Sequence, residues 1–99
     1  MSKPVACISD LLTDGDTIAK GSGNVFAENL PVSVHGDPTT GHACFPPTTM
    51  IATSGTVFVN NIPILRKDDS NVPHVCTAPP NPTDSGTVVV GRATVFAGD

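Results

Sequence analysis

The feature that most constrains this chain is an internal repeat that occurs in three copies. Each copy contains a ten-residue segment that opens with Thr and closes with Val-Phe, with a small-residue bend near its middle. The three segments are residues 17–26, 49–58 and 87–96. The pattern predicts a short strand, a tight turn or bulge, and a second strand in every copy.

A second element precedes each of these segments. It begins with Pro and ends six residues later with Asp, at residues 4–10, 31–37 and 63–69. We predict brief strands that each begin at the Pro, because Pro lacks a ladder donor and is tolerated at a strand start. Asn residues in the links 27–30 and 59–62 predict hairpin turns with positive φ. The repeats then run over about 4–26, 31–58 and 63–96, within a single domain of residues 1–99.

The loop between the two elements differs in length from copy to copy. It holds 6, 11 and 17 residues, at 11–16, 38–48 and 70–86. Three strand units with unequal loops predict a small conical pseudo-threefold β-prism whose loops converge at one end. The alternative is a chance match in a β-rich chain of low complexity.

Composition agrees with an all-β fold and excludes several classes of protein. Among 99 residues there are 10 Pro and 9 Gly but a single Glu, which disfavours helices. No apolar run approaches the roughly 20 residues of a membrane-spanning helix, and the N-terminus lacks the apolar stretch of a signal peptide. A net charge of −4 argues against a nucleic-acid partner.

The same composition predicts a thin core that needs external support. With four Phe and no Trp or Tyr, a metal, a disulfide or a partner has to supplement apolar burial. Three Cys residues are an odd count for a disulfide framework, and without a signal peptide metal ligation is the better first hypothesis.

The second and third loops each carry a His-x-Cys motif, and each His lies five residues after the Asp of its repeat. Two His and two Cys at equivalent positions of converging loops are the ligands of a closed tetrahedral Zn²⁺ site. We therefore expect His42, Cys44, His74 and Cys76 to bind zinc. Two alternatives stay open: a disulfide between Cys44 and Cys76, and histidines that are only exposed loop residues.

Other candidate residues have simpler interpretations. His35 aligns with Ile8 and Lys67 on a predicted strand, so a structural or surface role is expected, and Cys7 is expected to be a small buried residue. A catalytic zinc site would need an open position and a general base, whereas Glu28 is placed in a hairpin away from the loops. We predict no enzymatic activity.

In these features the chain resembles the PAAR-repeat proteins, the conical metal-bound tips of the type VI secretion spike and of some contractile phage tails. Residues 31–40 keep the family's opening Pro and its Gly-Asp-Pro-Thr-Thr ending, and residues 63–66 keep its Arg. No copy spells Pro-Ala-Ala-Arg, and the first loop has Asp14 near the position where the family often has a His. The resemblance leaves Asp14, as an oxygen ligand, and His35 as alternative members of the metal site.

The resemblance implies a structural role. It implies a monomer that caps a trimeric β-helical spike, VgrG-like or from a phage, and sharpens it for puncture of the target membrane, with effector cargo as a further possible partner. It also implies a protein that is cytoplasmic before assembly and is then delivered with the secretion apparatus or in the phage virion. Two alternatives are a small zinc- or disulfide-stabilised β module with another binding function and, less favoured, a zinc enzyme.

Overall fold

The computed structural model describes residues 2–98, apart from the side chains of residues 92–94. Over this range the chain forms short strands joined by turns and has no helix, so the all-β prediction is confirmed. Among the described residues there is accordingly no helix with the length and apolar character needed to cross a membrane.

Two hairpins form where the Asn-containing links predicted them. Strand β2 (Phe26–Ala27) pairs antiparallel with β3 (Leu30–Pro31), and β5 (Phe58–Val59) pairs in the same way with β6 (Ile62–Pro63). Positive φ angles of 51° to 72° occur at both central residues of each turn, which are Glu28 and Asn29, and Asn60 and Asn61. Such angles favour Asn and match the twist of a two-residue hairpin.

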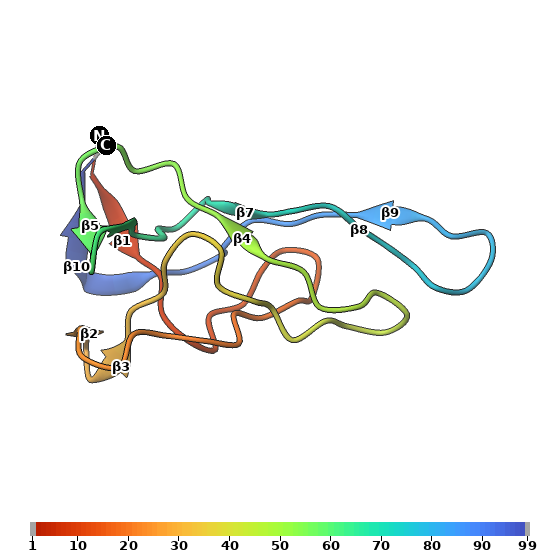
Figure 1. Cartoon of the computed structure of the whole chain (residues 1–99), viewed down its shortest axis with the longest axis horizontal. Helices are drawn as coiled ribbons and strands as arrows, with labels where there is room; N and C mark the ends of the chain where they lie inside the picture. The colour runs from red at the N-terminus through yellow and green to blue at the C-terminus, as the bar shows by residue number, and fades with distance from the viewer. Residues whose placement is uncertain (1, 99) are drawn as a thin grey trace.

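The first and last strands complete a third pair of the same kind. Strand β1 (Lys3–Val5) pairs antiparallel with β10 (Arg92–Ala97), and Phe96 lies opposite Pro4. This is the register of the two hairpins, in which Phe26 faces Pro31 and Phe58 faces Pro63. Lys3 and Ala97 therefore lie side by side, and this strand pair is at the same end of the molecule as both hairpins (Figure 1).

The remaining strands lead away from this end. Strand β4 (Met50–Ile51) pairs with β7 (Ser70–Asn71), and β8 (His74–Val75) pairs with β9 (Thr83–Asp84) in a long hairpin that projects to the opposite end (Figure 1). The principal extents are 41, 25 and 23 Å. We call residues 11–16, 38–48 and 70–86 the tip loops, and residues 3–10, 17–37, 49–69 and 87–97 the base.

The strands predicted to begin at a Pro are shorter than expected and lie earlier in the chain. Strands β3 and β6 end at Pro31 and Pro63, and the residues that follow form single bridges to neighbouring repeats instead of a continuous strand. The bridges join Val5 with Arg66, Cys7 with Val32, and Val34 with Ile64. Each bridge connects a different pair of repeats. Isolated bridges between repeats therefore take the place of the continuous strands that were expected.

The Asp that closes each of these elements ends it with the same turn. One carboxylate oxygen, Oδ2, accepts a hydrogen bond of 2.8–2.9 Å from the backbone N–H three residues earlier. The backbone N–H of the Asp donates in turn to the carbonyl of that earlier residue, at 3.1 Å in every copy. The pairs are Cys7 with Asp10, Val34 with Asp37, and Arg66 with Asp69. This local bonding explains why Asp recurs at the position.

One residue from each repeat takes part in a closed cycle of backbone hydrogen bonds, which we call the base ring. Ala6 donates to Leu65, Leu65 donates to Ser33, and Ser33 donates to Ala6, at 2.9–3.0 Å. All three residues are completely buried. Since the bonds use only backbone atoms, the ring tolerates three different side chains.

The core consists of two clusters that draw equivalent positions from the three repeats. One cluster surrounds the base ring and the other lies among the hairpins. The first contains Ala6, Leu12, Ile18, Met50, Leu65 and Val88, and the second contains Val5, Cys7, Ala27, Val32, Val59, Ile64 and Ala97. Cys7 is buried with a free thiol, as its alignment predicted.

Candidate metal centre

Four side chains from all three tip loops gather beyond the core. Asp14 comes from the first loop, His42 from the second, and His74 and Asp84 from the third. One possible ligand atom from each side chain lies within 4.8 Å of the corresponding atom of every other. A group that could hold a metal ion therefore exists at the place where the loops meet, and we call it the tip cluster.

Four separations within the tip cluster are close to those between the ligands of a tetrahedral ion. The Nε2 atoms of His42 and His74 are 3.3 Å apart. Asp14 Oδ2 lies 3.6 Å from His42 Nε2 and 3.4 Å from His74 Nε2, and Asp84 Oδ2 lies 3.5 Å from His42 Nε2. Four ligands at about 2.0–2.1 Å from a tetrahedral Zn²⁺ are about 3.3–3.4 Å from one another. The atoms of Asp14, His42 and His74 are thus close to the spacing of ligands around one ion, and Asp84 has this spacing to His42.

The two imidazole rings are held in position by their neighbours. Nδ1 of His74 lies 2.8 Å from the carbonyl oxygen of Pro46, so this nitrogen carries the proton and donates it. In the neutral ring, Nε2 is then the nitrogen without a proton, and it faces the cluster. The His42 ring stacks on Phe45 with centroids 5.0 Å apart and planes at 22°. These contacts orient both rings without using Nε2 for any other bond outside the cluster.

Asp14 is fixed as a carboxylate. Its Oδ1 accepts a hydrogen bond of 3.0 Å from the Asp16 N–H, and its Oδ2 accepts one of 3.3 Å from Asn71 Nδ2. Burial raises the pKa of Asp14, but the hydrogen bond from Asp16 and the other polar neighbours outweigh burial, and the pKa lies below its ordinary value of 3.8. The packing is close, since a Cβ at Gly86 would meet Asp14 at 2.8 Å. Gly86 therefore allows the third loop to approach the first.

The structure corrects the expected role of two cysteines. Cys44 and Cys76 are joined in a disulfide, with Cα atoms 4.9 Å apart, so their sulfurs are not presented as thiolate ligands. The converging loops that were expected to bring the two sulfurs to a metal instead bring them to each other. The disulfide links the second and third tip loops, and the Thr77 N–H reinforces the link by donating to the Cys44 carbonyl at 3.1 Å.

His42 and His74 are brought together, and the candidate ligands beside them are carboxylates. Asp14 was an alternative on the sequence, because it lies near the family's His position. Asp84 was missed, although it faces His74 directly in the β8–β9 pair. Only the hairpin register reveals that contact, and the sequence between Val75 and Thr83 does not fix the register.

Two other predictions concern residues outside the tip cluster. His35 is exposed, and its Nδ1 accepts a hydrogen bond of 3.0 Å from the Ala52 N–H, which is the structural or surface role expected. Glu28 lies in the β2–β3 turn, at the end of the molecule opposite the β8–β9 hairpin (Figure 1).

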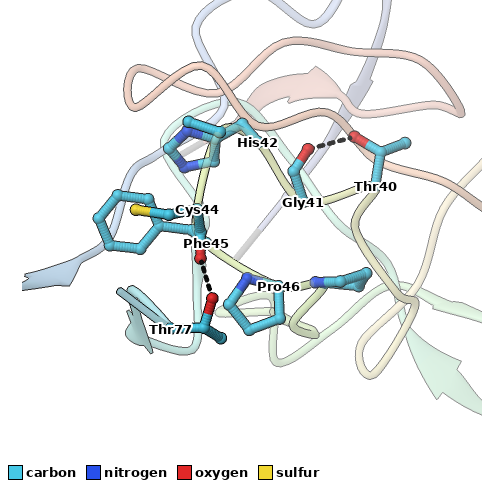
Figure 2. A pocket seen from close by; sticks show the side chains of 9 residues that line it. Thr40, Gly41, His42, Cys44, Phe45, Pro46 and Thr77 are labelled. Carbon is cyan, nitrogen blue, oxygen red and sulfur yellow. Dashed lines mark hydrogen bonds between the residues drawn. The ribbon is translucent and has the colours of Figure 1, made fainter. Parts of the chain in front are cut away.

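An open cavity of about 490 Å³ lies beside the tip cluster. It is bordered by the second loop, and Figure 2 shows His42 and Phe45 with Thr40, Gly41 and Thr77 around it. Thr77 also donates a weak 3.4 Å hydrogen bond from its hydroxyl to the Cys44 carbonyl. His42 borders the cavity and has 17 % of its side chain exposed, whereas His74 is almost fully buried.

No protein-family model and no curated protein matches the chain.

Proposed function

We propose that this protein is a structural spike tip, which caps a trimeric β-helical spike with its base and is stiffened at its other end by Zn²⁺ in the tip cluster. In this role it sharpens a contractile injection machine for puncture of a membrane and performs no catalysis. The proposal includes the pseudo-threefold β-prism, assembly from the cytoplasm, and delivery with a secretion apparatus or a phage virion. Effector cargo is a further partner that the role allows.

The observation that carries the proposal is the base ring. A cycle in which each repeat donates to one neighbour and accepts from the other is the bonding expected around a pseudo-threefold axis. A single chain with such a base can match the end of a partner that has true threefold symmetry. The equal register of the three strand pairs supports the same arrangement.

Apolar side chains at the base end supply a surface for the partner. The closing Phe of every repeat is more than half exposed: Phe26 at 56 %, Phe58 at 53 % and Phe96 at 56 %. Large exposed apolar groups at equivalent places are typical of a surface that is covered in an assembly. Three equivalent Phe side chains offer each subunit of a trimer the same contact.

The tip cluster supplies rigidity where apolar burial is small. A structural ion bound by two imidazoles and two carboxylates would tie all three loops together, and its binding free energy would add to folding stability. The two carboxylates would balance the charge of a divalent cation. Four protein ligands leave no open position for substrate, which agrees with a structural role.

Metal content and thermal unfolding test the stiffening role. Protein purified without chelator is expected to contain about one Zn²⁺ per chain, and removal of the metal should lower the melting temperature. An ion present at about 1,000 times its dissociation constant stabilises a protein by about 4 kcal/mol. His74→Ala should abolish the dependence on metal, whereas His35→Ala, at the exposed histidine, should keep it. A melting curve that is unchanged by EDTA, with no metal in the pure protein, contradicts this role.

Assembly with a spike tests the capping role independently. A VgrG-like or phage spike trimer should bind one copy of this chain, as measured by the mass of the complex in light scattering. Replacement of Phe26, Phe58 and Phe96 by Ser should abolish binding. The matched control replaces three exposed apolar residues of the tip loops, Leu11, Val72 and Val75, by Ser and should bind normally. Loss of binding in both variants, or in neither, contradicts docking through the base.

The disulfide favours a second candidate function. A disulfide-stabilised β module that acts in an oxidising environment would hold its tip with Cys44–Cys76 alone and would not need metal. Both candidates contain this disulfide, so the metal dependence of the melting temperature separates them, and thiol titration of the denatured protein with and without reductant verifies the disulfide. A metal-independent melting temperature, with one thiol per denatured chain before reduction and three after it, favours the module.

A further inference from the structure

Arg66 of the third repeat occupies a built site for a guanidinium group. The residue is 3 % exposed, and its Nη1 donates to the Gly98 carbonyl at 3.1 Å while its Nη2 donates to the Thr53 hydroxyl at 2.7 Å. The Thr53 hydroxyl donates in turn to Oδ1 of Asp69, whose Oδ2 accepts from the Arg66 N–H. Both oxygens of this buried carboxylate are therefore hydrogen-bonded within the chain.

The repeat alignment places an equivalent site one repeat earlier, with smaller side chains. Val34 stands where the third repeat has Arg66, and Gly21 stands where the second repeat has Thr53. Asp37 corresponds to Asp69 and Asn60 to Gly98. These four residues all line one cavity of about 230 Å³, between the bend of the first repeat and the β5–β6 hairpin. The guanidinium and the hydroxyl that fill the first site are missing from the second.

The carboxylate in this cavity keeps one oxygen available. Asp37 is 7 % exposed, and its Oδ2 accepts the Val34 N–H at 2.9 Å, as in the other repeats. Its Oδ1 has no hydrogen bond to any residue that the structure describes, in contrast to Oδ1 of Asp69. Lys20 borders the cavity and its charge acts on Asp37, but the two do not form an ion pair within the described chain.

We infer that the cavity between Gly21, Val34, Asp37 and Asn60 binds a guanidinium group supplied in trans. The chain itself shows how such a group is held, because the Arg66 site is its equivalent. A guanidinium can form a directed, charge-assisted hydrogen bond with the free Asp37 oxygen, which a buried carboxylate strongly favours. Burial of Asp37 is also what raises its pKa, and an adjacent cation offsets that effect.

The source we infer is an arginine side chain of the protein that docks on the base, because the cavity opens beside the β5–β6 hairpin, close to exposed Ile62. This assignment of the source rests on the proposed function. The site itself does not, since guanidinium binding can be measured on the isolated chain. Failure of the probe to bind leaves spike capping intact, and failure of spike capping leaves the site intact.

The experiment titrates ¹⁵N-labelled protein with methylguanidinium and follows amide chemical shifts. Saturable shifts at residues 20–23, Asp37 and Asn60 are expected, with a dissociation constant in the millimolar range. Asp37→Asn should weaken binding roughly tenfold or more, as for loss of a charged hydrogen-bond partner. Asp68→Asn is the control, because Asp68 is an exposed carboxylate that does not line the cavity, and this variant should leave binding unchanged.

A second variant keeps Asp37 and fills the site from within. Val34→Arg should raise the melting temperature and abolish the shifts, because the new side chain occupies the cavity as Arg66 occupies its own. Val34→Leu is the apolar control and should block the cavity without the gain from a charged contact. Absence of saturable shifts in the native chain, equal binding by Asp37→Asn, or equal binding of methylammonium overturns the inference.

Two further probes distinguish the sources of the guanidinium. N-acetyl-arginine amide imitates an arginine inside a protein, whereas free arginine adds a charged ammonium and carboxylate. Binding of the blocked form that equals or exceeds binding of the free amino acid supports a protein side chain. A clear preference for free arginine overturns the docking partner as the source.

Discussion

The base and the tip loops of this molecule are stabilised in different ways. In the base, equivalent residues repeat the same turns, registers and backbone bonds, even where the side chains differ, as in the base ring of Ala6, Ser33 and Leu65. In the tip loops, whose lengths differ, the only buried apolar residues among those described are Leu12 and Cys76. Repetition and burial therefore fix the base, whereas cross-links and polar contacts fix the tip.

This contrast teaches where change can be tolerated. A loop that contributes little to the core can vary in length, provided that some cross-link still closes it. A hydrogen bond can also connect two loops. The buried carboxylate of Asp16 in the first loop accepts one from the Gly41 N–H of the second loop, at 2.9 Å. The base has less freedom because its ring and its bridges join neighbouring repeats.

The largest expected effect comes from a cavity in the base. Leu65→Ala removes a completely buried side chain at the base ring and should destabilise the protein by about 2–5 kcal/mol. Chemical denaturation should show the loss in all regions at once, because the ring joins all three repeats. Val90→Ala, at a position 60 % exposed, is the control and should change stability by less than about 0.5 kcal/mol. Loss confined to one repeat would contradict a shared core.

Reduction of the disulfide should have a smaller and more local effect. Opening the Cys44–Cys76 link, in the presence of a chelator, is expected to cost about 2–4 kcal/mol. Hydrogen exchange followed by mass spectrometry should show faster exchange in 38–48 and 70–86, while the amides of Ala6, Ser33 and Leu65 stay protected. Equal acceleration in the base would show that the two regions are not independent.

The smallest effect is a pH dependence within the base. Burial raises the pKa of Asp37 above its ordinary 3.8, so the folded chain holds this proton more tightly than the unfolded chain does. The contribution of Asp37 to stability should therefore decrease as pH rises from the ordinary pKa through the raised one. Urea unfolding over the acidic range should show this decrease in the native chain and its absence in Asp37→Asn. A contribution that increases with pH contradicts the direction.

The parts of the fold that could be predicted are those encoded by local spacing. The hairpins follow from Asn at turn positions, and the closing Asp of each repeat marks a turn that its own carboxylate bonds. Strand length could not be predicted, because the residues after Pro31 and Pro63 pair with other repeats. Such pairing depends on how the three repeats pack against one another, and the sequence of one repeat does not determine that packing.

The candidate site was predictable only in part for a similar reason. His42 and His74 share one offset from the Asp of their repeats, and this offset brings them together. The same regularity also placed Cys44 near Cys76, but spacing alone does not separate two thiolates on a metal from a disulfide. Asp84 has no counterpart in the other repeats, so no repeated pattern could reveal it.

The pairing of β1 with β10 has a consequence for protein engineering. Phe96 and Pro4 lie opposite each other as the corresponding residues do in both hairpins. Strands β1 and β10 therefore have the pairing of a hairpin, but no turn joins them. A circular permutant that joins Ala97 to Lys3 through a two-residue turn and opens the chain between Asn60 and Asn61 would keep every strand pair described. A passenger domain could then be attached at a different edge of the base, while the loops that form the tip keep their order.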